Sequence, residues 1–393
     1  MSPLWYNISM IKVSNEINQL NHVMMHRPGH EIEQLTPYNL NRLLFEDMPF
    51  LSKAIDEHNT FVEVLKQSNI KVSDIKDLWL EVISIPHVYE DSIQTLLYDL
   101  KVKTPDVLNH VKNHLLSLNK ITLGNTFIEG LRYDTVGLEL QDDVFIIDPI
   151  PNLFFQRDPM FVIDDVAVIS HMASQARFRE SFISKMVVGF HPLFEGVHVI
   201  DMNQQPAIIE GGDVLLHDDM IWIGSSQRTD KEAILYLKQA LKSHGVHKKF
   251  IVFDIPKTRA YMHLDTIITV LDQDTYVLDP FAFKQVKLFE VHETLEPIDM
   301  SFELWLKTIS DVPKVIYVGG GDAIYSAREQ WNDAANTVAI EPGHVICYDR
   351  NDMTNSLIKK QGIKVQSIPS SELSRGRGGP HCMTMPLQRK SHT

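Results

Sequence analysis

The stretch Glu210-Gly211-Gly212-Asp213-Val214-Leu215-Leu216-His217-Asp218-Asp219-Met220-Ile221-Trp222-Ile223 decides the fold class. Two short and mostly apolar runs are separated by an Asp-Asp turn and preceded by a polar head. Short apolar runs bounded by turn residues are typical of buried strands joined as a hairpin. The stretch therefore predicts a β-hairpin that carries acidic residues at its entrance.

The same order of polar head, strand, turn and strand recurs three more times in the chain. The other copies begin at Asp158, Asp265 and Asn336, so successive units start roughly 50 to 70 residues apart. Repeats of this length suggest units stacked around a shared axis. If the units are equivalent, their polar heads converge at one end of that axis.

A helix and a further strand complete the unit between the second and third copies. Thr229 and Glu232 match a capping box at the start of this helix, and Gly245 follows its apolar stripe. The expected unit is therefore a hairpin, then a helix, then a strand.

Two segments differ from this repeat. Near the start, residues 22–26, 51–69 and 70–72 predict a strand, a helix and a strand. Between residues 77 and 137, apolar residues recur at helical spacing, Thr104-Pro105 is a plausible helix start, and strand signals are nearly absent. We expect a small helical insertion, residues 77–137, in a mixed α/β domain formed by residues 1–76 and 138–393.

The composition restricts the class of protein. Of 393 residues, 44% are hydrophobic and 22% are charged, which is typical of a globular chain with ample core. Acidic residues outnumber basic ones by 51 to 37, and a net charge of -14 disfavours nonspecific binding to nucleic acid.

Cysteine content and apolar runs indicate the compartment. Cys347 and Cys382 form neither a disulfide framework nor a zinc motif, and they fit a reducing environment. Residues 1–5 lack the features of a signal peptide, and no apolar run approaches the roughly 20 residues of a membrane span. We expect a cytoplasmic protein that binds no membrane.

A second stretch, residues 374–386, supplies a candidate nucleophile. Glycines alternate there with Arg375 and Arg377, and Cys382 follows. Glycine lets the backbone approach a ligand closely, and cationic neighbours favour a thiolate. The alternative is an ordinary buried thiol beside a flexible tail, and this stretch alone does not decide between the two.

The hairpin heads supply the groups that covalent catalysis by a cysteine requires. A nucleophilic Cys with a His and a carboxylate is the usual minimum. Taken singly, an Asp before a Pro is more often a turn residue, and a lone His is as often a core histidine. The combination is what indicates chemistry. The candidates are Asp158, Glu210, Asp213, His263 and Asp265.

The number of carboxylates indicates the charge of the substrate. Asp residues beyond the minimum set would repel a thiolate and raise its pKa. They make sense if the substrate is itself a cation. A guanidinium is planar, always charged, and offers five donors that two carboxylates can hold by paired hydrogen bonds. Its charge would also favour ionisation of Cys382.

At these residues the chain resembles the guanidine-modifying (pentein) superfamily of five-bladed α/β propellers and, within it, the arginine deiminase family. The resemblance runs nearly end to end. Its motifs are residues 43–45, 152–159, 210–213, 262–266, 328–331 with 336–337, and 371–386, of which the last is highly specific. The helical segment resembles the insertion that sets arginine deiminases apart from agmatine deiminases and dimethylarginine hydrolases.

This resemblance implies an activity and an assembly. The reaction would be hydrolysis of free L-arginine to L-citrulline and ammonia, through a covalent thiouronium adduct on cysteine. It would need no metal or organic cofactor. A homodimer or homotetramer is expected.

The resemblance also implies a role for each residue of the site. Cys382 would be the nucleophile, His263 the general acid and base, and Glu210 its charge-balancing partner. Asp158 and Asp265 would grip the guanidinium. The substrate-binding residues would be Arg177 and Arg228 on the α-carboxylate, Asn152, Phe155 and Leu44 along the pocket, Arg377 on a loop that closes the entrance, and Asp213 in the Glu-Gly-Gly-Asp motif.

Three positions depart from the usual pattern of the family. Gln156 stands where Thr is usual, Gln227 replaces a common acidic residue, and His381 precedes the nucleophile where many members have Arg. None removes a catalytic group. The first two bear on pocket polarity, and His381 bears on the pKa of Cys382 and hence on the working pH.

Several alternatives remain open from the sequence. An amidinotransferase shares the covalent first half of the reaction, and a deiminase of another guanidino compound shares all of it. A cysteine hydrolase acting on acyl groups needs no cluster of carboxylates, so Asp158 and Asp265 speak against it. A non-catalytic arginine-binding protein needs no nucleophile. For Arg177 and Arg228 the alternative is a surface ion pair.

Overall fold

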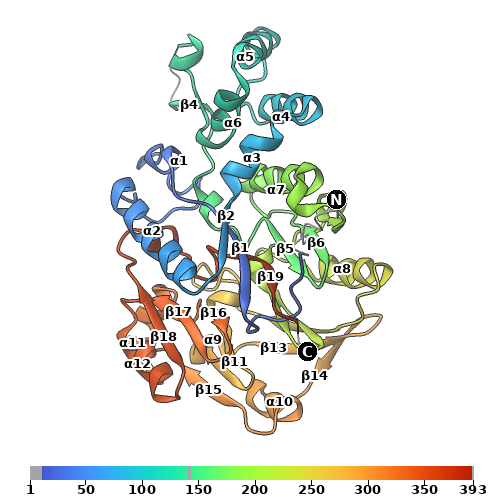
Figure 1. Ribbon diagram of the computed structural model, residues 1–393, viewed down its shortest axis with the longest axis vertical. Helices are drawn as coiled ribbons and strands as arrows, with labels where there is room; N and C mark the ends of the chain where they lie inside the picture. Colours follow the sequence, from blue (N-terminus) through green and yellow to red (C-terminus); the bar gives the residue numbers. More distant parts are fainter. Residues whose placement is uncertain (1–10, 140–142, 392–393) are drawn as a thin grey trace, which may run out of the picture.

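The computed structural model describes residues 11–139 and 143–391, and it has a mixed α/β architecture (Figure 1). Residues 1–5, where the sequence predicts no signal peptide, lie outside the described ranges. Within those ranges, no helix combines the length and the apolar character that crossing a membrane would require.

Five sheets share one connectivity, and the hairpins expected from the repeat are confirmed. In each sheet the first two strands pair antiparallel, and a third strand pairs parallel to the second. The strands of the first two sheets are β5 (Met160–Ile163), β6 (Val166–Ile169) and β7 (His198–Asp201), and β8 (Val214–His217), β9 (Met220–Ser225) and β10 (Lys249–Asp254). The next two sheets contain β11 (Ile268–Asp272), β12 (Thr275–Leu278) and β15 (Lys314–Tyr317), and β16 (Val338–Glu341), β17 (His344–Tyr348) and β18 (Lys364–Ile368).

The fifth sheet joins segments near the two ends of the described chain. β19 (Met385–Arg389) pairs antiparallel with β1 (Leu20–Met25), and β1 pairs parallel with β2 (Lys71–Asp74). The expected strands at residues 22–26 and 70–72 are thus confirmed. Because β19 follows the cysteine-containing stretch directly, this pairing fixes where that stretch lies.

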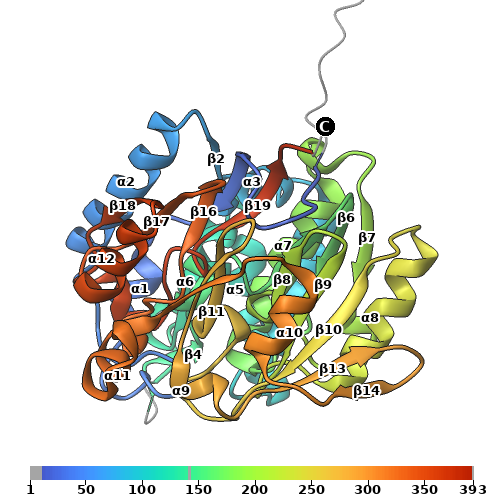
Figure 2. The same cartoon turned by 90° about the horizontal axis from the view of Figure 1, so that it is seen from below.

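Helices connect the second and third strands of the sheets. They are α2 (Leu51–Gln67), α7 (Phe178–Phe190), α8 (Lys231–Ser243) and α12 (Asp352–Lys360), while α9 (Pro280–Phe283) and α10 (Phe302–Ile309) lie between β12 and β15. α11 (Ala323–Trp331) precedes β16, and β13 (Lys287–Val291) and β14 (Leu295–Ile298) extend the sheet of β10. Figure 2 shows α2, α12 and α8 on the outside of the molecule.

Aspartate turns close two of the hairpins. Asp164 and Asp218 have positive φ angles of 51° and 49°. Asp and Asn tolerate this left-handed conformation better than other residues with a side chain, and it suits the tight turn between twisted strands. The Asp-Asp pairs of the repeat are therefore turn residues, and the carboxylates with a chemical role lie at the other end of each hairpin.

The segment without strand signals is helical, as expected. It contains α3 (Ile75–Val82), α4 (Pro86–Tyr98), α5 (Pro105–Ser117) and α6 (Lys120–Glu129), and these helices lie together above the sheets in Figure 1. Thr104 caps α5 by accepting the N–H of Val107, with Pro105 at the first helical position. α1 (His30–Glu33) and the short strands β3 (Leu131–Arg132) and β4 (Phe145–Ile147) flank this segment.

The capping box expected at α8 is wrong. The residue before the helix is Asp230, and neither it nor Thr229 caps the helix with its side chain. Thr229 Oγ1 accepts the N–H of Glu210 at 3.2 Å, and Asp230 Oδ2 accepts the N–H of Ile208 at 3.1 Å. Thr229 thus satisfies the buried N–H of Glu210 and fixes it in place, and Asp230 satisfies the partly buried N–H of Ile208 in the segment that leads into β8. Gly245, with a φ of 83°, ends the helix as expected.

Candidate active site

The polar heads of the hairpins and the loop before β19 meet at one cavity, so the expected convergence is confirmed. The cavity is lined by Leu44, Asn152, Phe155, Asp158, Arg177, Arg228, Met262, His263, Gly376, Arg377 and Cys382. Of the residues expected to bind substrate or catalyse, Glu210, Asp213 and Asp265 do not line it but lie directly behind those that do. All three are fully buried.

Gly212 makes the close packing of the site possible. A Cβ atom at this position would lie 2.6 Å from His263 Nδ1 and 2.8 Å from Asp158 Oδ1. Contacts this short are not tolerated, so any side chain here would displace the imidazole and the carboxylate. The glycine pair in the motif at 210–213 therefore lets three functional segments approach one another.

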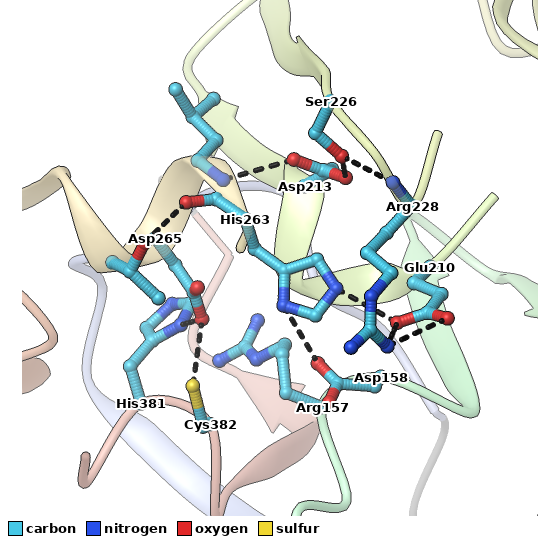
Figure 3. A network of polar contacts seen from close by, with 12 residues as sticks. Arg157, Asp158, Glu210, Asp213, Ser226, Arg228, His263, Asp265, His381 and Cys382 are labelled. Atoms are coloured by element: carbon cyan, nitrogen blue, oxygen red, sulfur yellow. Dashed lines mark hydrogen bonds and ion pairs between the residues drawn. The ribbon is translucent and has the colours of Figure 1, made fainter. Parts of the chain in front are cut away.

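His263 is held by a carboxylate on each ring nitrogen. Its Nε2 lies 2.8 Å from Glu210 Oε2, and its Nδ1 lies 3.7 Å from Asp158 Oδ1 (Figure 3). Burial alone would lower the pKa of His263, but Asp158, Glu210 and Asp213 outweigh it and raise the pKa to about 9. The imidazole is therefore a proton donor at neutral pH.

Glu210 carries a negative charge that is balanced by cations. Its carboxylate lies 3.3 Å from Arg228 Nη1 and 3.9 Å from Arg177 Nη1, and it also accepts the N–H of Ala173. Burial works to raise the pKa of Glu210, but Arg228, His263 and Arg177 lower it far below its ordinary value. Glu210 is thus ionised and able to stabilise a protonated His263.

Asp158 and Asp265 each form a hydrogen bond through one oxygen, and Asp158 Oδ1 also faces His263 Nδ1 at 3.7 Å. Asp158 Oδ2 binds Arg177 Nη1 at 2.6 Å, and Asp265 Oδ2 accepts from His381 Nδ1 at 2.8 Å. The remaining oxygen of each carboxylate is buried without a hydrogen-bond partner among the described residues. A buried carboxylate oxygen without a donor is costly, so these two atoms are the natural acceptors for a cationic ligand.

Cys382 lies beside Asp265, with its Sγ 3.5 Å from Asp265 Oδ2 (Figure 3). Burial, and then the charges of Asp265, Asp158 and Asp333, raise the pKa of the thiol well above its ordinary value. The thiol is therefore protonated unless a cation binds nearby. Its main chain is fixed, because the Cys382 N–H donates to Asn336 Oδ1 at 3.0 Å and its carbonyl accepts the N–H of Arg157 at 3.0 Å.

The arginines of the site differ in how far they are engaged. Arg177 is 3% exposed and binds both Asp158 and Glu180, so it is no surface ion pair. Arg228 is partly buried, and within residues 11–139 and 143–391 its guanidinium hydrogen-bonds only to Glu210, at 3.3 and 3.4 Å. Arg377 lines the cavity without any hydrogen bond from its guanidinium among the described residues.

Asp213 has a different place from the one expected. Its Oδ1 accepts the N–H of Leu264, and its Oδ2 accepts from Ser226 Oγ at 2.6 Å. Oδ1 thus joins the turn at Gly211–Asp213 to the turn at Leu264–Thr266, and Oδ2 joins it to the residue that follows β9. Asp213 therefore positions the segment that carries His263, and it does not reach the cavity where a substrate would bind.

The pocket-lining residues lie where they were expected. Leu44 and Phe155 contribute apolar wall, and Asn152 donates from Nδ2 to the carbonyl of Leu43 at 2.7 Å. Leu44 has a φ of 65°, an unusual value for a leucine, so the neighbouring carbonyl held by Asn152 lies on a sharply turned segment.

Two functional residues were missed at the sequence level. Asn336 accepts the N–H of Cys382 through Oδ1 and donates from Nδ2 to the carbonyl of Asp265 at 3.0 Å, so it ties the nucleophile to a guanidinium-binding candidate. Its position as the fourth hairpin head was the available signal. Glu180, which binds Arg177, lies three residues later in the same helical segment, a spacing that places side chains on one helix face.

The three departures from the family pattern have different surroundings. Gln156 donates to the carbonyl of Leu153, and Gln227 donates to the carbonyl of Lys257, and neither lines the cavity. His381 lies between Asp265 and Glu16, at 2.8 and 3.3 Å, and is 2% exposed. Of the three departures, His381 is therefore the one that contacts a residue of the candidate active site, namely Asp265.

Asp158, Glu210 and His263 have ligand atoms within 4.8 Å of one another, a spacing that a metal ion would accept. Arg177 binds Asp158, and Arg228 binds Glu210. These guanidinium groups and a protonated His263 already supply positive charge to the carboxylates. A divalent cation at this position would therefore face direct repulsion from these three groups.

Known proteins match the chain over most of its length. A sequence model of the arginine deiminase family matches residues 41–389. An arginine deiminase of Latilactobacillus sakei is 36% identical, over 97% of this chain and 99% of the relative. An arginine deiminase of Borrelia recurrentis (strain A1) is 37% identical, over 97% of this chain and 98% of the relative.

Solved structures of low sequence identity share the fold. A dimethylarginine dimethylaminohydrolase (DDAH) mutant from Pseudomonas aeruginosa, complexed with citrulline, superposes with a TM-score of 0.55 at 17% identity, covering 93% of this chain and 99% of that one. SxtG, an amidinotransferase from Microseira wollei, gives a TM-score of 0.58 at 13% identity, covering 97% and 98%. From the family match and the full-length relatives, the chain belongs to the arginine deiminase family.

Proposed function

We propose that this protein hydrolyses free L-arginine to L-citrulline and ammonia through a covalent adduct on Cys382. The observation that carries the proposal is the pair of buried oxygens on Asp158 and Asp265 that have no hydrogen-bond partner among the described residues, while the sulfur of Cys382 lies 3.5 Å from the other oxygen of Asp265. A guanidinium satisfies both oxygens with paired hydrogen bonds and brings its carbon to the thiol. Full-length similarity to arginine deiminases supports the choice of substrate.

Binding of the substrate ionises the nucleophile. The carboxylates around Cys382 hold the pKa of the thiol high while the cavity has no cation. A guanidinium between Asp158 and Asp265 neutralises these charges, so the thiolate forms where its target carbon lies. Cys382 therefore becomes a thiolate, and hence a nucleophile, when a cationic substrate binds.

The reaction then proceeds in two halves. The thiolate of Cys382 attacks the guanidinium carbon to form a C–S bond, and His263 donates its proton to the leaving nitrogen as the C–N bond breaks and ammonia departs. Water next attacks the thiouronium carbon, and His263 accepts a proton from it. The C–S bond breaks as the hydroxyl proton of this adduct passes to solvent, which releases neutral citrulline and restores the thiolate.

The remaining site residues support His263 and bind the substrate. Glu210 stabilises the protonated His263, and Arg177 and Arg228 supply positive charge for the α-carboxylate. Asn152, Phe155 and Leu44 line the pocket. A loop bearing Arg377 closes the entrance.

We further propose that the five sheets are the blades of an α/β propeller, made by residues 1–76 and 138–393. In this assignment residues 77–137 form an inserted helical domain. The shared connectivity of the five sheets supports the propeller, and the run α3 to α6 supports the insertion. A homodimer or homotetramer and a cytoplasmic location complete the proposal. Cys347 and Cys382, both free thiols, support a reducing compartment.

The test is formation of citrulline and ammonia by the purified protein from free arginine, without an added amine acceptor. We expect turnover with arginine and far less with agmatine or methylated arginines, because Arg177 and Arg228 favour a substrate with a carboxylate. Activity only with an added amine would instead indicate an amidinotransferase, the alternative that the similarity to SxtG favours.

Cys382→Ala is expected to lower citrulline formation by roughly a thousandfold or more, because the covalent route is lost. Cys347→Ala is the matched control, since Cys347 is a free and buried thiol in β17, outside the cavity. Wild-type turnover by Cys382→Ala would refute the proposal.

A further inference from the structure

Arg377 is a buried cation that no acceptor of the described residues engages. It is 5% exposed, and its Nε, Nη1 and Nη2 are all buried without a hydrogen-bond partner. The residue lines the cavity together with Cys382. Its backbone is left-handed, with φ 61° and ψ 64°, which is uncommon for a residue other than glycine. A buried guanidinium in this state needs some other contact to hold its position.

Trp331 provides that contact. The Arg377 Cζ lies 3.5 Å from the centroid of the Trp331 ring. Stacking of a guanidinium on an indole is attractive, and it uses the face of the guanidinium, so the N–H groups around its edge stay available. Trp331 is itself 44% exposed, and hence it is not simply a core residue.

The end of α11 that carries Trp331 is fixed from several sides. Glu329 accepts the N–H groups of Met353 and Thr354, each at 2.9 Å, and Gln330 donates to the carbonyl of Ala260 at 2.7 Å. Five residues beyond Trp331, Asn336 accepts the N–H of Cys382. The indole is therefore anchored to the same framework as the nucleophile.

The other cavity arginines, which supply positive charge for the α-carboxylate in the proposed function, already have carboxylate partners. Arg177 binds Asp158 and Glu180, and Arg228 contacts Glu210. Near Arg377, the carboxylate of Asp333 is buried, and neither of its oxygens has a hydrogen-bond partner among the described residues. A guanidinium released from the indole would be drawn to this carboxylate, and its donors would then be used up.

We propose that Trp331 is a positioning residue, whose indole face holds the Arg377 guanidinium on the cavity wall with its donors free for the substrate. This inference rests on the proposed function. The α-carboxylate is the acceptor that L-arginine offers, because its ammonium and guanidinium groups only donate. Trp331 thereby contributes to recognition of a free amino acid without touching it.

The first test compares Trp331→Leu and Trp331→Phe in steady-state kinetics with arginine. Loss of the aromatic face is expected to raise KM about three- to 20-fold and to change kcat less than about twofold, because the contact serves binding and not bond breaking. Trp331→Phe keeps an aromatic face and is expected to keep most of the wild-type affinity for arginine. Tyr325→Leu is the control: it lies on the same helix, is 52% exposed, and has no place in the cavity.

The second test separates positioning from a general structural effect. In an Arg377→Ala background, Trp331→Leu is expected to add no further rise in KM. Equal effects with and without Arg377, or an unchanged KM in an active Trp331→Leu enzyme, would overturn the inference. If Trp331→Leu does not fold, Trp331→Gln keeps a polar, half-exposed residue there and carries the same comparison. A wild-type protein that makes no citrulline would overturn the proposed function instead.

Discussion

At the scale of single residues, the protonation state of each catalytic side chain depends on the charges that lie next to it. His263 lies between Glu210 and Asp158, and its pKa rises to about 9 although burial opposes this. Cys382 meets Asp265 and is held in the protonated form. Without substrate, the site therefore contains a protonated imidazole, a protonated thiol, and one oxygen each on Asp158 and Asp265 that can accept from a cationic ligand.

Glu210→Gln is expected to lower the pKa of His263, because one of the negative charges that raise it is removed. His263 then loses its proton at a lower pH, so the descending high-pH limb of kcat/KM moves down from about 9. The shift is read from the pH profile and, since activity also falls, from titration of the histidine signals by NMR.

Glu232→Gln is the matched control for this exchange. Glu232 is an exposed carboxylate on α8, so its loss should leave the limb in place. A high-pH limb and a histidine titration that stay unchanged in Glu210→Gln would contradict the assigned role of Glu210.

The residues that the sequence did not identify are those whose partners are distant along the chain. Asp213 sits in a recognisable motif, yet its oxygens serve Leu264 and Ser226 instead of the cavity. Asn336 was visible as a hairpin head and in the motif at residues 336–337, but its bonds to Cys382 and Asp265 depend on where two other sheets place those residues. A motif identifies the residue type, and the packing of the surrounding chain determines which groups that residue contacts.

At the scale of secondary-structure elements, helices do more than cover the sheets. α2 carries Glu57, which is 3% exposed and accepts the N–H groups of Ser371, Glu372 and Leu373 at 2.9 to 3.0 Å. It also accepts from Ser371 Oγ at 2.6 Å. This one carboxylate caps the turn at Leu373–Gly376 that leads to the nucleophile. The element that fixes the loop is thus more than 300 residues away in sequence.

Glu57→Ala is expected to lower the free energy of unfolding by about 3–5 kcal/mol, since two buried backbone donors and one partly buried donor lose their acceptor. Urea unfolding followed by circular dichroism measures this change. Glu63→Ala removes an exposed carboxylate from the same helix and should alter the free energy of unfolding by less than about 0.5 kcal/mol. Equal unfolding midpoints for the two variants would show that the cap is not needed.

At the scale of the whole molecule, the two ends of the described chain are joined in one sheet. β19 pairs with β1, and Leu387 in β19 is fully buried in the largest apolar cluster. Lys12 also donates its N–H to the carbonyl of Leu387 at 2.9 Å. Because Cys382 directly precedes β19, the contacts that close the fold also place the nucleophile.

Leu387→Ala is expected to destabilise the whole molecule by about 2–5 kcal/mol, which is usual for a cavity in a well-packed core. Thermal unfolding should remain one transition at a lower temperature, and inactivation should follow it. Gln388→Ala, at the next and half-buried position, serves as control. An unchanged midpoint for Leu387→Ala would mean that the chain ends contribute little to the fold.

The sequence by itself determined the repeated hairpins, the helical segment, the nucleophile candidate and its carboxylates. These follow from local patterns, namely apolar periodicity, turn residues and motif spacing, which act over a few residues. Only the tertiary structure decided that Thr229 holds Glu210 instead of capping α8, that Arg177 is engaged by Asp158, and that Trp331 carries Arg377. Hydrogen bonds and ion pairs go to the donor or acceptor that lies nearest in space, and that neighbour is set by how five sheets and both chain ends pack together.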